Sequence, residues 1–441
     1  MMKFVGMMLF ISFMLVKNYM IMFYYNLCYL MSFMIIFMYM FKDIWWGGIS
    51  LMISCHYYSI WLVILSLWIM SLMMMCLDKL LVSKMLMFLG LLLFLVMFFL
   101  SMDLILFYFM FEVSLIPTFF LIIYWGVNLE RVNASYYLLM YMLLVSFPLL
   151  LYILKMYLYG LTLKFNLMLL VMEMYEFHFG GYMIIFTAFF IKMPMYITHV
   201  WLPKAHVEAP VYGSMILAGV LLKMGGYGLI RMLEIFNSNS LKYNYIIFSI
   251  SIIGGLLTGM VCLVQVDMKS LVAYSSVVHM NLILCSLMTL FECGVLSGYI
   301  MMISHGLCSS GLFYMVNIYY SRTKSRLLVL NKGLISKLSI FMLWWSLLCF
   351  ANFSFPFSLN FISEILMLMV IINWCNFSMI FLMVICFLSS AYSLYLFSYV
   401  QQGGGNEGGE VYGSGVVKEF LVLVMHFFPL LMFLMNLIIF M

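Results

Sequence analysis

Four ionisable side chains lie inside long apolar stretches of the sequence: Glu112, Lys192, Lys223 and Glu364. Burying a charge at the centre of a bilayer costs ~2.5–3.5 kcal/mol on insertion scales, so such residues are rare without a role. Two opposite charges ~4 Å apart attract by about 4 kcal/mol at an effective dielectric constant of 20. Moving one proton against roughly 180 mV also requires about 4 kcal/mol. One ion pair that forms and breaks is therefore sufficient to move a proton, and we predict a proton path through these four side chains.

Each of these residues also has a purely structural interpretation. Lys192 and Lys223 could extend their amines to the membrane surface. Glu364 could cap a helix, and Glu112 could make a structural hydrogen bond. Both lysines lie far from the ends of their apolar stretches, which favours a role inside the membrane.

Histidines on the same stretches are candidate relays. His279 and His305 are 26 residues apart on neighbouring apolar segments. They could hold a haem if both faced one cavity, form hydrogen bonds in a core, or relay protons, because imidazole changes its charge near neutral pH. His199 and His206 are seven residues apart beside Pro203, and we expect them to line a polar break rather than to bind a metal.

Two apolar segments combine a charge with a proline that interrupts a helix: residues 189–210 and residues 351–366. Lys192 and Glu364, one in each segment, are 172 positions apart, and a second pair of buried titratable residues is 167 positions apart. A repeat of about five spans would superpose both pairs, although two similar offsets can also arise by coincidence. Interrupted helices at matching places in two repeats indicate an ion site at mid-membrane.

Composition defines the elements that must position these residues. The chain has 441 residues, of which 68% are apolar and 8% charged, with a mean hydropathy of +1.19. Soluble domains are ~45–50% apolar and ~25% charged, so the bilayer must be the solvent. Residues 86–100 are apolar at every position, which excludes the alternating pattern of a membrane barrel. We predict an all-α polytopic membrane protein with about 14 transmembrane helices, some of them broken.

The predicted spans are apolar segments separated by polar loops. They lie near residues 4–16, 20–41, 57–77, 85–101, 104–124, 134–156, 181–200, 213–232, 244–264, 271–291, 296–318, 339–371, 376–400 and 417–440. With the N-terminus outside, the inner segments carry twelve Lys and Arg residues and the outer segments six. This bias favours placing both termini on the outer side.

Other classes of site have no sequence signal. The ten cysteines are scattered without a CxxC motif, so we expect neither a metal nor an iron–sulfur cluster in this chain. The net charge of +5 is too small and dispersed to indicate nucleic-acid binding. No phosphate-binding glycine motif occurs, and the glycine-rich residues 401–416 are predicted to be a flexible linker. The 49 methionines would follow if ATA codons were read as Met, which predicts a mitochondrially encoded protein.

Several long motifs carry a resemblance to a known family. They include FEVSLIPTFFLIIYWG, IKMPMYITHVWLPKAHVEAPVYGSMILAGVLLKMGGYGLIR, DMKSLVAYSSVVHM and ISHGLCSSGLFYMVN. With NFISEI, they occur in order between residues 105 and 400. In these motifs the sequence resembles the chain 4 family of antiporter-like membrane subunits of mitochondrial NADH:ubiquinone oxidoreductase, respiratory complex I. The first hundred residues and the tail match that family only in hydropathy.

The resemblance implies roles for particular residues. It assigns proton-path roles on four spans: Glu112 on the fifth, Lys192, paired with it, on the seventh, Lys223 on the eighth and Glu364 on the twelfth. It assigns three histidines to a hydrated axis: His199, His279 and His305. Phe357 and Ser363 depart from the pattern expected of the family near the twelfth-span acid.

The resemblance also implies two inverted five-helix repeats. It divides the chain into residues 1–84 (spans 1–3), 85–232 (first repeat), 244–400 (second repeat), 401–416 (linker) and 417–441 (last span). It implies proton translocation across the mitochondrial inner membrane, driven by NADH oxidation and ubiquinone reduction in other subunits.

The partners implied are other complex I membrane subunits, including neighbouring antiporter-like chains, and the lipid bilayer. NADH, FMN, iron–sulfur clusters and ubiquinone are expected in other subunits, with no cofactor or redox centre in this chain. A stand-alone cation/proton antiporter and a structural membrane spacer are the alternatives.

Overall fold

The computed structural model describes residues 6–7, 21–39, 53–77, 81–160, 162–172, 178–404 and 415–440. Within these ranges the chain is helical, and its β structure is limited to three isolated bridges. Ten of the described helices are long and apolar enough to cross a membrane. The prediction of an all-α polytopic membrane protein is therefore confirmed. The predicted span at 4–16 falls almost entirely outside the described residues, as does most of the predicted linker at 401–416.

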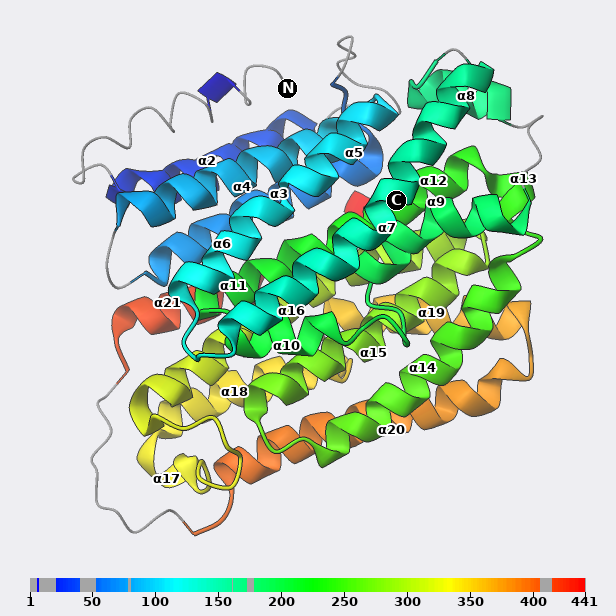
Figure 1. Cartoon of the computed structure of the whole chain (residues 1–441). Helices are drawn as coiled ribbons and strands as arrows, with labels where there is room; N and C mark the ends of the chain where they lie inside the picture. Colours follow the sequence, from blue (N-terminus) through cyan, green and yellow to red (C-terminus); the bar gives the residue numbers. More distant parts are fainter. Residues whose placement is uncertain are drawn as a thin grey trace. The chain divides into compact units, whose positions relative to one another are not determined.

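The chain forms two compact units (Figure 1). The first unit consists of Met1–Met193 and Glu208–Tyr245, and the second of Pro194–Val207 and Ile246–Met441. The assignment of five-helix repeats to 85–232 and 244–400 stays a prediction.

The first unit contains the helices before residue 245, apart from α10. They are α2 (Ile21–Tyr39), α3 (Tyr57–Met75), α4 (Val82–Leu100), α5 (Leu104–Val113), α6 (Leu115–Trp125), α7 (Arg131–Gly160), α8 (Phe165–Met172), α9 (Phe179–Lys192), α11 (Val211–Ile216), the π-helical segment η3 (Leu217–Leu221), α12 (Leu222–Ile235) and α13 (Asn237–Ser240). Helix α9 packs against α7 and α12, and α4 packs against α3 and α5.

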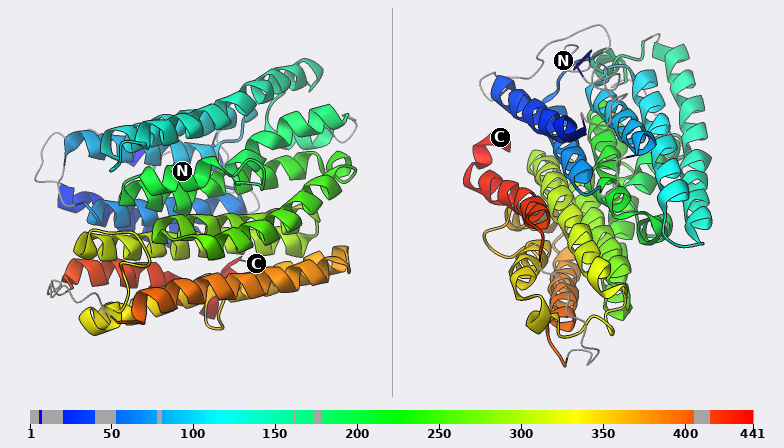
Figure 2. Two further views of the ribbon diagram at one scale, coloured as in Figure 1. Left: turned by 60° about the horizontal axis from the view of Figure 1, so that its bottom comes forward. Right: turned by 90° about the vertical axis from the view of Figure 1, so that its left-hand side faces the viewer.

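The second unit contains nearly all of α10 and α14 and every later helix. They are α10 (Trp201–Glu208), α14 (Asn244–Val264), α15 (Met268–Met288), α16 (Glu292–Thr323), α17 (Leu334–Lys337), α18 (Ser339–Asn352), α19 (Leu359–Trp374), α20 (Ser378–Gln401), α21 (Val417–Met435) and the 3₁₀ turn η4 (Leu437–Phe440). In Figure 2 the long helices of this unit run roughly along one direction.

Helix α16 is the centre of the second unit and packs against α15, α18, α19 and α21. Two of its glycines allow the close approach. A Cβ at Gly298 would lie 3.1 Å from Ser286 Oγ on α15, and one at Gly311 would lie 3.0 Å from Leu348 Cδ2 on α18. Small residues at such crossings let membrane helices gain packing contacts that lipid tails cannot supply.

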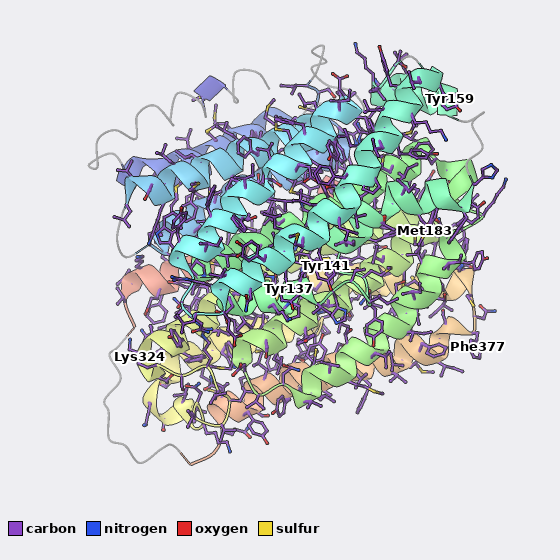
Figure 3. The ribbon with its side chains drawn as sticks, viewed as in Figure 1. Tyr137, Tyr141, Tyr159, Met183, Lys324 and Phe377 are labelled. Carbon is purple, nitrogen blue, oxygen red and sulfur yellow. The ribbon has the colours of Figure 1, made fainter. Side chains whose placement is uncertain are left out.

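Helix α7 presents apolar and aromatic side chains at the surface of the first unit. Tyr137, Tyr141 and Tyr159, labelled in Figure 3, lie along it, and Tyr137 and Tyr159 are exposed. Leu144 and Leu158 on the same helix are also exposed. Exposed apolar side chains of this kind suit contact with lipid tails or with neighbouring membrane helices, because hydrocarbon surrounds a membrane-spanning segment in place of water.

Candidate functional site

The first break in a transmembrane helix lies directly after Lys192, the last residue of α9. Pro194 follows, and proline lacks the N–H that would continue the helical hydrogen bonds. The chain stays irregular until α10 begins at Trp201. Within the break, Ile197 has φ of 50°. A β-branched residue in this left-handed region is strained, and such strain is concentrated at functional sites.

Lys192 is buried at this break with the end of α5 beside it. Its Nζ donates a hydrogen bond to the Phe111 carbonyl oxygen at 3.4 Å and lies 3.8 Å from the centroid of the Phe111 ring. The next residue, Glu112, interacts electrostatically with Lys192, and Ser146 on α7 lies beside the Glu112 carboxylate. Glu112 Oε1 is buried and has no hydrogen-bond partner within the described ranges. The structure therefore brings Glu112 and Lys192 together.

Helix α12 lies against the same break. A Cβ at Gly225 would lie 2.8 Å from Met193 Cγ and 3.1 Å from Lys192 Cβ, so only glycine allows this approach. Lys223 lies two residues earlier on α12 and is fully buried. Its Nζ donates a hydrogen bond to the Ala218 carbonyl oxygen at 2.6 Å, within the π-helical segment η3. The amine therefore turns back into the apolar span instead of reaching for the membrane surface.

The second break separates α18 from α19 in the second unit. Residues 353–358 are not helical, and Pro356 lies among them. Ser354 and Phe357 have φ of 61° and 77°. A proline could not replace Phe357 in this conformation, because its ring holds φ near −65°. The amide of Asn360 spans the break and donates a hydrogen bond from Nδ2 to the Ala351 carbonyl oxygen at 2.7 Å.

Glu364 lies in the second turn of α19, beyond this break, and meets two histidines. Its Oε1 is 3.4 Å from Nδ1 of His279 on α15. The ring centroids of His279 and His305, on α15 and α16, are 5.6 Å apart. Both histidines are buried. The structure therefore gathers Glu364, His279 and His305 into one cluster, here called the imidazole cluster.

Buried polar atoms of His279, and of Asn281 and Tyr392 in the same unit, have no hydrogen-bond partner among the described residues. Neither ring nitrogen of His279 and neither amide atom of Asn281 has a hydrogen-bond partner in the described part of the chain. The Tyr392 hydroxyl, fully buried on α20, also has no hydrogen-bond partner among the described residues. Buried polar groups are nearly always paired, and where protein does not pair them the usual partner is ordered water. This composition suits a hydrated region.

The other two histidines lie on the segment that follows the first break. His199 stacks on Tyr196, with ring centroids 5.3 Å apart, and lies 6.3 Å from Tyr274 on α15. His206 is buried and stacks on Phe313 at 4.7 Å. In the ranges that the structure describes, no group of three or more His, Cys, Asp or Glu side chains is placed to hold a metal ion.

Two residues near the candidate site were not identified from the sequence. Ser146 beside Glu112 has no local signal, because serines are scattered through many of the spans. Asn360 does have one, since it is a polar residue four positions before Glu364 on the same face of a largely apolar helix.

Comparisons with known proteins agree with this architecture. A sequence family described as NADH:quinone oxidoreductase/Mrp antiporter, TM, matches residues 101–391. NADH-ubiquinone oxidoreductase chain 4 of Ceratitis capitata is 44% identical over 439 residues, covering 98% of this chain and 97% of the relative. The protein of the same name from Aedes aegypti is 48% identical over 329 residues, covering 75% of this chain and 73% of the relative.

A solved structure also has this fold. A chain in respiratory complex I from Thermus thermophilus with bound NADH superposes with a TM-score of 0.86 at 19% sequence identity. The superposition covers 97% of this chain and 94% of that chain.

Proposed function

Because the chain belongs to the NADH-ubiquinone oxidoreductase chain 4 family, we propose that the ionisable side chains inside its apolar spans are the groups that carry protons through the membrane. The chain is a proton-translocating membrane subunit of NADH:ubiquinone oxidoreductase. The proposed carriers are Glu112, Lys192 and Lys223 in the first unit and Glu364 in the second. His199, His279 and His305 are the proposed relays in the second unit.

The observation that carries this proposal is the position of Lys192 at a helix break, buried, with Glu112 as its electrostatic partner. A carboxylate that gains a proton no longer attracts the neighbouring ammonium, so the lysine releases its proton more readily. At an effective dielectric constant of 20, a pair ~4 Å apart loses about 4 kcal/mol in this step. That is enough to load and eject one proton against a respiratory membrane potential.

The energy for this cycle comes from outside the chain. We propose that NADH, FMN, iron–sulfur clusters and ubiquinone act in other subunits, and that this chain holds no cofactor. Its partners are then other complex I membrane subunits, including neighbouring antiporter-like chains, within the lipid of the mitochondrial inner membrane. Relatives that match almost the whole chain carry the oxidoreductase name, which favours this function over a stand-alone antiporter.

Substitution of Lys223 by alanine tests the proposal. It removes a buried switchable charge, so proton transport per NADH oxidised should fall in vesicles, while the assembled amount stays near normal. The matched control is Lys155→Ala, which removes an exposed lysine near the end of α7 and should leave transport unchanged. A structural membrane spacer predicts the reverse pattern, with changed assembly and normal transport in whatever complex forms.

A further inference from the structure

The buried face of α12 carries more than Lys223. Tyr227 and Arg231 follow at intervals of four residues, which places all three on one face of the helix. Tyr227 and Arg231 are buried, and the Tyr227 hydroxyl donates a hydrogen bond to the Phe99 carbonyl oxygen at 3.0 Å. These three polar side chains form a row along α12 that extends from Lys223 towards the end of the helix.

Arg231 lies where this face reaches the end of the helix. Its Nη1 is 3.3 Å from Glu234 Oε2, and the Glu234 side chain is 33% exposed. Its guanidinium lies 4.6 Å from the centroid of the Phe165 ring, and Nη2 lies 3.8 Å from Met102 Sδ. Arg231 is 2% exposed, so a permanent charge is held between the buried face and water.

The loops at this end of the first unit are tied together around the guanidinium. Phe165 N donates to the Met102 carbonyl oxygen at 3.0 Å, and Leu104 N donates to the Leu163 carbonyl oxygen at 2.9 Å. Met102 and Phe165, which both contact Arg231, are thereby fixed to each other. Arg231 is therefore held in one place by its neighbours rather than on a free side-chain arm.

The hydrogen bonding of Arg231 is incomplete. A guanidinium has five N–H donors, and Arg231 Nε is buried without a partner among the residues described. The nearby titratable groups are Glu234, Tyr227 and His56, which precedes α3. Only Glu234 among these carries a carboxylate, so the positive charge of Arg231 faces a single negative charge. Ordered water is the usual partner of a buried donor that the protein leaves unpaired.

We infer that Arg231 is an electrostatic barrier that stops protons leaking along the α12 face between Lys223 and the aqueous phase. Arginine does not release its proton in proteins, so it cannot pass a proton on as lysine or histidine can. It repels any hydronium that approaches along this face, in the way that a buried arginine excludes protons from water channels. This inference rests on the proposed proton path through Lys223.

Passive leak is the property to measure, because pumping would confound the barrier with the carriers. The assembled complex is reconstituted in vesicles with a trapped pH-sensitive dye, and a potassium diffusion potential is imposed without NADH or quinone. Arg231→Gln should raise the proton flux per complex at least tenfold, which corresponds to about 1.4 kcal/mol. A flux equal to that of the wild type overturns the inference.

Three further variants separate a barrier from looser packing. Arg322→Gln is the matched control, because Arg322 also pairs with a glutamate and lies over a phenylalanine ring, on α16 of the second unit. It should not leak. Glu234→Gln removes the partner but leaves the cation, so its leak should stay at or below the wild-type level, and a leak like that of Arg231→Gln contradicts the barrier. Arg231→Lys keeps a cation that can release its proton, so its leak should be intermediate, and a wild-type leak again overturns the inference.

The double variant Arg231→Gln, Lys223→Met distinguishes this inference from the proposed function. If the leak runs through Lys223, the second substitution should bring it back towards the wild-type level. If the leak stays high, the barrier at Arg231 is supported and the assignment of Lys223 to the proton path is wrong.

Discussion

In the first unit the acid Glu112 has a lysine as its neighbour, whereas in the second unit Glu364 has a histidine. The helix breaks differ in the same way. Lys192 is the last residue before its break, while Glu364 lies beyond its own, in the second turn of α19. The lysine is held by a carbonyl oxygen and an aromatic ring, whereas His279 in the imidazole cluster has ring nitrogens with no hydrogen-bond partner among the described residues. We expect the first arrangement to depend on the charges of a pair, and the second on the length of the acid side chain.

The sharpest test of this difference is a double substitution in the first unit. Glu112→Gln and Lys192→Met should each lower proton transport about tenfold or more, since each removes a proton-carrying group. Because one partner has no function without the other, the double variant should be little worse than the poorer single one. Transport per NADH oxidised, at matched levels of assembled complex, is the measurement. Losses that multiply would mean that the two side chains act separately.

In the second unit the corresponding test concerns the length and the titration of the Glu364 side chain. Glu364→Gln keeps the shape and loses the titration, so transport should fall about tenfold, while Glu364→Asp should lose only about threefold. Aspartate retains the charge but withdraws it by one methylene from His279 Nδ1, now 3.4 Å away. Equal transport in the Gln and Asp variants would make Glu364 a structural cap on the broken helix.

Asn360 should have a smaller effect, through the position of Glu364. Asn360→Ala removes the hydrogen bond to the Ala351 carbonyl oxygen and should cost about 1 kcal/mol of stability. Asn360→Asp should be worse, because a carboxylate presents only acceptors to that carbonyl oxygen. Thermal inactivation of the complex and transport by Glu364→Asp in each background give the comparison. If Asn360→Asp were as stable as the wild type, the Asn360 amide would not hold α18 and α19 together.

The smallest expected effect is at Ile197 in the first break. Replacing it with glycine relieves the strain of a φ of 50°, and the gain in stability should be at most about 1 kcal/mol after the entropy cost of glycine. Val200→Gly is the control, because it is an exposed β-branched residue of the same break without a positive φ. It should lower stability. Identical shifts in thermal inactivation for both variants would show that the backbone at Ile197 is not strained.

The class of the fold follows from composition, but the details of the site depend on contacts that composition cannot express. Apolar runs interrupted by Pro194 and Pro356 predict membrane helices with breaks, and the structure has breaks at both places. The meeting of Glu364 with His279 joins residues 85 positions apart. Such a meeting depends on how α15 packs against α19, and the resemblance placed Glu364 on the proton path and His279 on the hydrated axis without giving their distance.

Other features are invisible in the sequence for physical reasons. The partner of Asn360 is a backbone carbonyl, which every residue possesses, so no residue type signals it. Helix α7 runs to Gly160 through Pro148, four residues further than the span predicted at 134–156. The offset of 172 between Lys192 and Glu364 remains a prediction of repeats, and the two residues lie on opposite sides of their breaks.

The π-helical segment Leu217–Leu221 determines the direction in which the side chains of α12 point around the helix axis. A π turn contains about one residue more than an α turn, so the helix after it is rotated by about 100° from the course of the helix before it. Lys223, Tyr227 and Arg231 all follow, and therefore turn as one block. Deleting a single residue from this segment would barely alter hydropathy or length, yet it would point all three in another direction. In a span composed almost wholly of apolar residues, the number of residues that precede a charged side chain determines the direction in which it points.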